Sequence, residues 1–369
     1  PEKRDNDLLY QIALTLIPGI GPKTAAALLQ HFGTAEEVFR AAPQQIKRVE
    51  GIGAGKVVLI KDPDILRRAS AEAEFVTREG IRCLFIDDPD YPYRLKYCND
   101  APVLLFSKGN ADLNVAKTVA VIGTRKSTAY GQELCDMLIN GLKRYRDLLV
   151  ISGMAYGIDA AAHKKCVKEG VPTTGVLAHG LDRIYPFAHK SLAAEMCACG
   201  GLLTEFPSGT NPDKTNFPIR NRIVAGMSDV VVVVESDLKG GAVITAYLAA
   251  GYNREVAAFP GRVHDPCSRG CHMLIRKNIA AMITSADDLA DLMGWQTQTH
   301  PRAIQPELLP LLTPEQQTVM GVFRNKEILH TDELLQQTTM NSSLLAATLL
   351  GLEMQGILKA LPGKYYRRC

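Results

Sequence analysis

Five consecutive valines, Val230 to Val234, place the strongest constraint on how this chain can fold. Asp229 precedes the run and Glu235 follows it, so its length suits a single strand. A strand with one face in solvent alternates apolar and polar residues, whereas this segment is apolar at every position. Strands that are buried on both faces occur mainly in parallel sheets that carry helices on both sides. The chain is therefore expected to contain an α/β domain.

Other apolar segments of strand length recur between residues 67 and 290 and alternate with helical segments such as 131–144 and 160–168. The predicted strands are 81–86, 118–122, 148–151, 173–178, 230–235 and 255–259. Alternation of this kind predicts a doubly wound, mostly parallel sheet with right-handed crossovers. Such sheets bind ligands at the carboxyl ends of their strands, so the loops that follow the strands form the candidate site.

Residues 1–66 predict a helical module that precedes the α/β domain at 67–295. Two related turns, 17–23 and 49–56, place glycines between helical segments in a pattern that resembles a helix-hairpin-helix (SAM-like) module. The backbone amides of such hairpins can bind phosphate. The simpler alternative is a small helical bundle whose glycines only close turns.

Residues 296–305 are polar and contain proline, which predicts a linker. Residues 306–369 predict a helix from about Thr313, helices at 329–337 and 341–355, and two strands across a Pro-Gly turn. This order resembles a winged-helix domain. The basic residues of its last two strands are Lys359, Lys364, Arg367 and Arg368. They could form a basic edge for DNA, but winged helices also dock proteins, and the sequence leaves both roles open.

The 369 residues carry a formal net charge of only +3, so a polyanion would have to bind a local patch. Nine cysteines without paired spacing and the absence of an apolar leader predict a reducing, cytoplasmic location. No apolar run approaches the roughly 18 residues of a membrane span, so no membrane contact is expected. One group of soft ligands could hold zinc: His264, Cys267, Cys271 and His272. Because their spacing is cramped and no second pair accompanies them, no metal site is predicted.

The loop after the strand at 118–122 combines a glycine with hydroxyl and cationic side chains. Its candidate anion-binding residues are Gly123, Thr124, Arg125 and Ser127. Gly123 lets backbone amides approach an anion, and Ser127 and Thr128 could cap the following helix. The chain contains neither the Gly-x-Gly-x-x-Gly pattern of dinucleotide-binding proteins nor the Gly-x-x-x-x-Gly-Lys-Ser/Thr pattern of ATPases. No cofactor is therefore predicted.

The loop after 148–151 begins with Ser152 and Gly153 and leads into a segment that contains Asp159 and His163. Asp159 and His163 are four residues apart on one helical face, a spacing that would suit an acid–base pair. We interpret them as structural. Because Ser152 does not lie in a Gly-x-Ser-x-Gly motif, it is not a hydrolase nucleophile of that kind. No catalytic residue is predicted.

Later loops place charge beside aromatic rings. Between residues 180 and 190 these side chains are Arg183, Tyr185, Phe187 and Lys190. Single-stranded nucleic acid is bound in this way, with cations on phosphates and rings on bases, and a stacked base contributes on the order of 1–3 kcal/mol. Lys239 and Gly240 follow the valine strand and begin another helix.

Residues 217–226 place Arg220, Asn221 and Arg222 at the start of an apolar run. Arginine offers a planar, permanently charged fork suited to phosphate oxygens, and asparagine adds a neutral donor and acceptor. A polar cluster beside a buried parallel strand predicts a ligand that carries phosphate. The residues themselves leave open whether that ligand is a nucleotide or a polynucleotide.

Together these loops resemble the DNA-processing protein A family (DprA, also called Smf). The resemblance covers residues 91 to about 283. It rests on five motifs in this order: 121–125 (Val-Ile-Gly-Thr-Arg), 152–163 (Ser-Gly-Met-Ala-Tyr-Gly-Ile-Asp-Ala-Ala-Ala-His), 180–186 (Gly-Leu-Asp-Arg-Ile-Tyr-Pro), 217–223 (Phe-Pro-Ile-Arg-Asn-Arg-Ile) and 259–261 (Phe-Pro-Gly). The helical first module and the winged last module fit the family's three-part layout.

The resemblance implies an extended Rossmann-like domain without enzymatic activity that binds and protects single-stranded DNA during natural transformation. It also implies a homodimer formed through this domain, and a role in loading the RecA recombinase. By motif position, Arg125, Arg220 and Arg222 are expected to contact phosphates. Backbone or hydroxyl contacts are expected from Gly123, Ser152 and Gly153.

The chain departs from the family pattern at two places. Tyr156 stands where the family usually has arginine, so one phosphate-binding cation is missing and a ring that could stack on a base replaces it. Gly240-Gly-Ala stands where Ser-Gly-Ser is usual, which removes hydroxyls from that loop.

Two other functions compete with DNA binding. Related Rossmann-like phosphoribohydrolases cleave nucleotides and usually carry Gly-Gly-x-Gly-Thr-x-x-Glu, but the matching loop from Gly240 to Thr245 lacks the catalytic glutamate. The chain could also be an interaction scaffold whose working part is the winged module.

Overall fold

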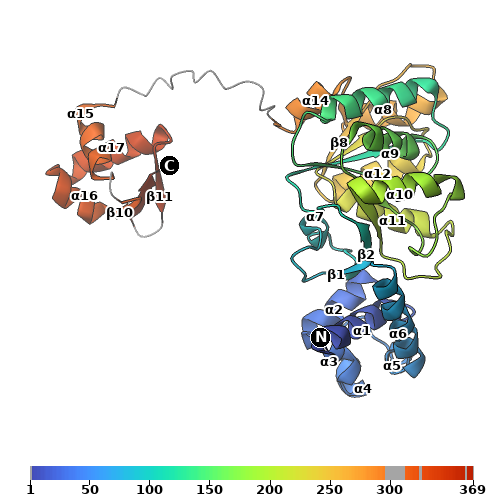
Figure 1. Ribbon diagram of the computed structural model, residues 1–369. Helices are drawn as coiled ribbons and strands as arrows, with labels where there is room; N and C mark the ends of the chain where they lie inside the picture. Colours follow the sequence, from blue (N-terminus) through green and yellow to red (C-terminus); the bar gives the residue numbers. More distant parts are fainter. Residues whose placement is uncertain (1, 296–311, 324–325, 362–363, 369) are drawn as a thin grey trace. The chain divides into compact units, whose positions relative to one another are not determined.

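The protein is described here by a computed structural model that covers residues 2–295, 312–323, 326–361 and 364–368. The chain divides into two compact units, residues 1–297 and 298–369, and each has its own hydrophobic core (Figure 1). Among the described residues, no helix combines the length and the apolar character needed to cross a bilayer.

A nine-stranded sheet forms the centre of the first unit, with the strand order β1-β2-β6-β5-β4-β3-β7-β8-β9. The strands from β6 to β9 in this order are parallel, whereas β1 and β2 add an antiparallel edge. The strands are β1 (Arg82–Phe85), β2 (Leu104–Gly109), β3 (Lys117–Ile122), β4 (Leu148–Gly153), β5 (Thr173–Val176), β6 (Gly200–Thr204), β7 (Val230–Val233), β8 (Glu255–Ala258) and β9 (Ala281–Met282). The predicted doubly wound, mostly parallel sheet is confirmed.

The valine run forms β7, between β3 and β8. Val230 and Val232 pack into the core on one face of the sheet, and Val231 and Val233 pack into the core on the other. From β3 the chain adds β4, β5 and β6 in one direction and then places β7 on the other side of β3. The strand order therefore reverses between β3 and β7, and doubly wound sheets bind ligands at such a reversal.

Helices cover both faces of the sheet (Figure 1). The core of one face contains residues of α8 (Ala129–Leu142), α9 (Ile158–Glu169) and α14 (Ala286–Leu292). The core of the other face contains residues of α11 (Asn216–Gly226), α12 (Gly241–Gly251) and α13 (Arg269–Arg276). A smaller apolar cluster joins α10 (Lys190–Cys199) to β6.

The first module is helical, as predicted, and packs against the antiparallel edge of the sheet. Its helices are α1 (Glu2–Leu16), α2 (Pro22–Phe32), α3 (Ala35–Arg40), α4 (Pro43–Ile46), α5 (Ala54–Ile60) and α6 (Pro63–Arg78). Gly19 and Gly51 in the two predicted hairpins have φ angles of 75° and 79°, a region that favours glycine. Phe85 of β1 and Phe106 of β2 share the apolar core of this module. The predicted boundary at residue 66 falls inside α6.

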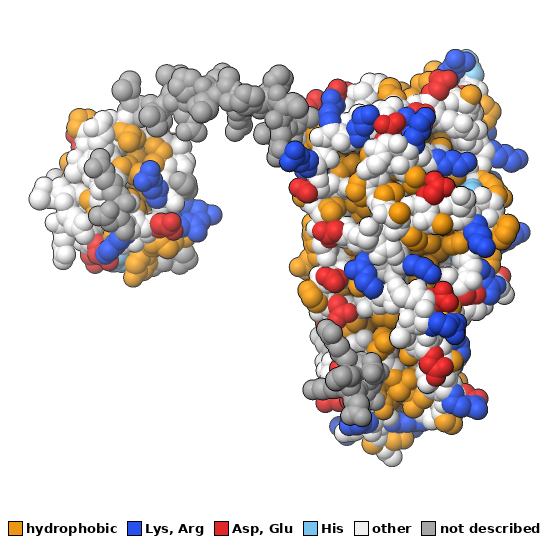
Figure 2. All heavy atoms as spheres, viewed as in Figure 1, with side chains coloured by type: hydrophobic (Ala, Val, Ile, Leu, Met, Phe, Trp, Pro, Cys, Tyr) orange, Lys and Arg blue, Asp and Glu red, His pale blue; other side chains and the backbone are white. Residues whose placement is uncertain are grey.

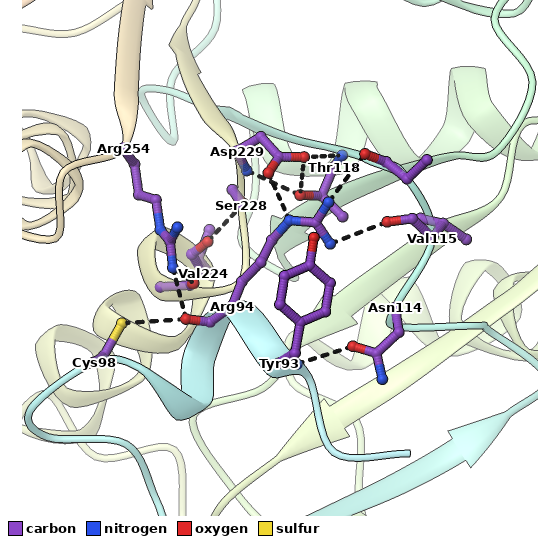
Figure 3. Close-up of polar contacts among 12 residues, drawn as sticks. Tyr93, Arg94, Cys98, Asn114, Val115, Thr118, Val224, Ser228, Asp229 and Arg254 are labelled. Carbon is purple, nitrogen blue, oxygen red and sulfur yellow. Dashed lines mark hydrogen bonds and ion pairs between the residues drawn. The ribbon is translucent and has the colours of Figure 1, made fainter. Parts of the chain in front are cut away.

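A partly buried ion pair fixes the amino ends of β3 and β7 (Figure 3). Arg94, in α7 (Tyr93–Lys96), places its Nε 2.6 Å from Oδ1 of Asp229 and donates to the carbonyl of Val115 at 3.0 Å. The other oxygen of Asp229 accepts from the amide of Thr118 at 2.9 Å. Because Arg94 is only 3% exposed, we assign this network to the framework and not to ligand binding.

The second unit has the winged-helix architecture that the sequence predicts. Its elements are α15 (Pro314–Val322), β10 (Ile328–His330), α16 (Thr331–Thr338), α17 (Ser342–Met354), β11 (Leu358–Leu361) and β12 (Tyr365–Arg368). The predicted helix at 329–337 is wrong at its start, because Leu329 and His330 belong to a strand that pairs with β12. The predicted linker at 296–305 lies outside the described residues.

Candidate nucleic-acid interface

A cleft of about 500 Å³ opens at the strand reversal between β3 and β7. The loops after β3, β4 and β7 and one face of α11 line it. Its polar and aromatic lining includes Thr124, Arg125, Asp159, Lys214, Phe217, Arg220, Asn221 and Thr245. The sequence predicts this edge of the sheet, but Lys214, Phe217 and Asp159 were not among the predicted contact residues.

The loop after β3 is held from beneath by Glu235, which is 1% exposed and follows β7. The Glu235 carboxylate accepts from the backbone amide of Thr128 at 3.0 Å and from the Thr128 hydroxyl. The Glu235 carbonyl accepts from the amide of Thr124 at 2.8 Å. A side chain at Gly123 would place its Cβ 2.5 Å from Ile158, so only glycine fits this close crossing. The loop that carries Arg125 is therefore rigidly positioned.

Arg125 is exposed, and its guanidinium lies over the ring of Phe217 with its Cζ 4.7 Å from the ring centroid. This cation–π contact joins the loop after β3 to the start of α11. Within the described residues Arg125 forms no ion pair. It therefore offers an exposed positive charge and a flat surface at the cleft.

Arg220 forms the floor of the cleft and is only 4% exposed. Its Nη1 donates to the carbonyl of Val176, and its Nε donates to Oδ1 of Asn221 at 3.0 Å. A Cβ on Gly153 would lie 2.5 Å from Oδ2 of Asp159 and 2.6 Å from Nη1 of Arg220. Because Gly153 has no side chain, the Asp159 carboxylate and the Arg220 guanidinium can both lie against its backbone.

Burial raises the pKa of Asp159 to about 6, and the positive charge of Arg220 opposes that rise. Burial also lowers the pKa of Arg220, an effect that Asp159 opposes. Near pH 6 the net charge of the cleft floor therefore depends on whether Asp159 carries a proton.

His163 has a structural role, as predicted. It is completely buried, and its two ring nitrogens lie 2.7 Å from Oγ1 of Thr173 and 2.8 Å from the carbonyl oxygen of Gly153. Burial lowers the pKa of His163 to about 4. Ser152 is also fully buried and donates to the carbonyl of Val121 at 2.6 Å, so its hydroxyl supports the sheet beneath the cleft.

Arg222 does not line the cleft. Its guanidinium forms an ion pair with Glu205 and donates to the carbonyl of Asp100. Arg222 is 8% exposed, and burial raises the pKa of Glu205. The expected phosphate contact of Arg222 stays a prediction, but these contacts favour a structural role.

A second, smaller hollow adjoins the cleft and shares Arg125, Phe217 and Arg220 with it. Tyr156 and Tyr185 lie on its rim. Its volume of about 30 Å³ is far smaller than that of the cleft, so a base could stack on its rim but could not enter it in this conformation. Tyr156, which is 50% exposed, packs edge-on against His189 with 5.0 Å between the ring centroids.

The remaining predicted residues lie around the cleft. Arg183 pairs with Asp182 and donates to Asn211, so its charge is compensated. Phe187 is 77% exposed, and Nζ of Lys190 lies 5.7 Å from its ring centroid. Gly240 lines the cleft where α12 begins, and the preceding Lys239 is exposed. Ser127 is half-buried and accepts from Nε2 of Gln132 at 3.1 Å.

The cysteine and histidine group considered for zinc does not form a ligand set within the described part of the chain. Cys271 is buried, with its sulfur 3.7 Å from the carbonyl oxygen of Val233. It is therefore part of the core between α13 and β7.

The fold and the cleft define a class: a doubly wound α/β protein whose candidate anion site lies at the reversal of the strand order. Comparison with known families identifies the family within this class: the chain belongs to the DNA-processing protein A (DprA/Smf) family. Residues 82–294 match the family described as DNA recombination-mediator protein A. Residues 12–62 match a SAM-like helix-hairpin-helix tandem, and residues 303–364 match the DprA winged-helix domain.

Individual relatives agree with this assignment. The chain is 34% identical to the putative DNA processing protein DprA of Mycobacterium tuberculosis, over 81% of this chain and 80% of the relative. It is 30% identical to protein Smf of Synechocystis over 99% of both chains.

Two solved structures also match. DprA from Streptococcus pneumoniae has a TM-score of 0.66 and 32% identity, covering 77% of this chain and 97% of that one. DprA from Helicobacter pylori, described for its single-stranded DNA binding mode, has a TM-score of 0.52 and 27% identity, covering 58% of this chain and 95% of that one.

Proposed function

We propose that the cleft between β3 and β7 binds single-stranded DNA and that the protein acts as a recombination mediator, without catalysing a reaction. The observation that carries the proposal is Arg125, an exposed cation without an ion-pair partner among the described residues. Its guanidinium lies on the ring of Phe217 at the strand reversal. The family that the chain matches is described as a DNA recombination mediator. The DNA-binding relative from Helicobacter pylori supports the same ligand.

The geometry favours a single strand over a duplex. Tyr156, Tyr185 and Phe217 place rings around the cleft, and two of these rings are about half exposed. Bases can stack on such rings only when they are not already paired and stacked within a duplex. Arg125 and Lys214 line the cleft with Phe217, and Lys190 lies against the ring of Phe187; these cations would bind the phosphates.

We infer that the bound strand is protected and passed to RecA during natural transformation, and that a homodimer formed through the Rossmann-like domain carries out this step. The family description supports the mediator role, and relatives named DNA processing protein support a role in handling DNA. Arg220 is proposed to bind phosphate from the floor of the cleft, whereas Arg222 is proposed to position α11.

The proposal is tested by equilibrium binding of the full chain to a fluorescent oligothymidine and to a duplex of equal length, at several salt concentrations. We expect tighter binding to the single strand and a log–log salt slope of about −0.7 for each phosphate neutralised. Faster RecA assembly on DNA coated by a single-strand-binding protein would extend the result to mediation. Equal or stronger binding to the duplex would overturn the single-strand assignment.

A further inference from the structure

The three-stranded sheet of the second unit exposes one face to solvent. Its strand order is β10-β12-β11, and directly paired residues lie on the same face. Leu329, Tyr366 and Leu358 pack into the unit's core from the inner face. The outer face, here called the wing face, consists of Ile328, His330, Lys359, Leu361, Tyr365 and Arg367.

Two cations of the wing face oppose each other. Arg367 pairs directly with Lys359 on the neighbouring strand, and both side chains are exposed. Like charges placed directly opposite destabilise a sheet. The wing face contains no acidic residue, and neither cation forms an ion pair within the described parts of the unit. Folding does not account for this arrangement, but a polyanion bound across both strands would.

Aromatic side chains lie in the adjoining row of the wing face. Tyr365 is 43% exposed and pairs directly with His330, whose ring meets it edge-on with 4.8 Å between the centroids. Ile328, in the row of the cations, is 47% exposed. A flat ring beside two cations on an open sheet surface is the arrangement by which sheets stack unpaired bases and bind their phosphates.

The neighbouring helix is unsuited to reading a duplex. Winged-helix and related proteins place a recognition helix in the major groove, where its polar side chains bind base edges. The last helix before the wing, α17, contains no lysine or arginine, and Leu344, Leu350 and Met354 on its surface are 44%, 57% and 83% exposed. The nucleic-acid-binding character of this unit is therefore concentrated on the wing face.

We propose that the wing face is a second binding surface for single-stranded nucleic acid, in which Lys359 and Arg367 bind phosphates and Tyr365 stacks on a base. This surface is additional to the cleft of the first unit and does not depend on it. DNA binding at one of the two sites can therefore be disproved by experiment without disproving binding at the other.

A matched pair of variants on one strand tests the surface. Arg367 lies on the wing face, whereas the adjacent Arg368 lies on the opposite face, where it pairs with Leu358. Both arginine side chains are exposed. In the full chain, Arg367→Ala combined with Lys359→Ala should lower the steepness of the log–log salt dependence by about 1.4, or 0.7 for each cation. Arg368→Ala should leave it nearly unchanged. The measurement is repeated in an Arg125→Ala background, so that tight binding in the cleft does not hide the effect.

Equal effects of Arg367→Ala and Arg368→Ala would mean diffuse attraction and would overturn the proposal. So would unchanged DNA binding in the Arg367→Ala and Lys359→Ala variant, which would leave the exposed wing face to a protein partner. Stronger loss of duplex binding than of single-strand binding would overturn the ligand assignment.

Photo-cross-linking locates the contact directly. Full-length protein is irradiated with an oligonucleotide that contains 5-iododeoxyuridine, and the cross-linked peptides are identified by mass spectrometry. Adducts at Tyr365 that disappear in Arg367→Ala/Lys359→Ala protein, but persist in Arg125→Ala protein, would support an independent wing-face site. Adducts confined to the first unit would contradict it.

Discussion

The cleft of the first unit and the wing face of the second both combine cations with aromatic rings, but they are built differently. In the cleft, buried carboxylates support the binding residues: Glu235 holds the loop of Arg125, and Asp159 lies near Arg220. On the wing face, Lys359 and Arg367 have no such support and lie on short exposed strands. A preorganised site loses less entropy when it binds, so the cleft should dominate affinity. Substitutions of the buried residues of the first unit should also lower its stability, whereas substitutions on the wing face should weaken binding without destabilising the fold.

Arg222→Ala should have the largest effect and should act on the fold. It leaves Glu205 as a buried charge without its partner, and removal of one member of a buried ion pair typically costs about 3–5 kcal/mol. Denaturant unfolding should show this loss for the first unit. Arg367→Ala, the comparison on the wing face, should leave unfolding of the first unit unchanged. A folded Arg222→Ala protein of normal stability with weakened DNA binding would instead make Arg222 a direct phosphate ligand.

Gly153→Ala should damage both folding and binding. Its new Cβ would overlap Asp159 and Arg220, and overpacking of this kind costs about 1–3 kcal/mol. Because Arg220 must move, affinity for single-stranded DNA should fall about tenfold or more, as expected when a charge-assisted contact worth about 1.5–3 kcal/mol is lost. Gly251→Ala is the control, since a Cβ there meets nothing within 4 Å. Equal affinity of the two variants would show that Arg220 does not contribute to binding.

Asp159→Asn should have the smallest effect, and it should depend on pH. The pKa of Asp159 rises from 3.8 to about 6 in the folded protein, so its protonated form is favoured there. Its contribution to stability is present below about pH 4 and is lost as the pH rises through about 6. Protonation also removes a negative charge from the cleft. Wild-type affinity for DNA should therefore increase as the pH falls from 7 to 5, by roughly fivefold for an interaction of about 1 kcal/mol.

The Asp159→Asn protein should bind at pH 7 about as tightly as the wild type binds at pH 5, and its affinity should change little between these pH values. Titration of labelled oligonucleotide at both pH values measures this. The wing face contains His330, so both proteins also carry His330→Ala and the comparison isolates the cleft. A pH dependence that persists in the variant would exclude Asp159 as its source.

The sequence predicted the architecture well where a pattern is repeated or extreme. The valine run indicated a strand buried on both faces, and β7 has cores on both sides. Strands β2, β6 and β9 were not predicted. β6 begins with Gly200 and Gly201, which lack β propensity, and β9 has only two residues, so pairing with neighbours defines both strands.

The candidate site was located by topology, but the roles of its arginines could not be read from their order. Arg220 and Arg222 are two residues apart and chemically identical, yet one lines the cleft and the other binds Glu205. Helix α11 sends these side chains in directions about 160° apart, and only the packing of that helix decides which one meets the ligand. Phe217 belongs to one of the family motifs, but its contact with Arg125 joins segments about ninety residues apart, which no local pattern predicts.

The central claim is that DNA binds in the cleft through Arg125, and the most direct test compares Arg125→Ala with Lys126→Ala. The two residues are adjacent, exposed and equally charged, but only Arg125 lines the cleft. The measurement is the affinity for single-stranded DNA as a function of salt. Arg125→Ala should weaken binding about tenfold or more and reduce the steepness of the log–log slope by about 0.7, while Lys126→Ala should have little effect. Equal behaviour of the two variants would contradict the account and place the DNA elsewhere.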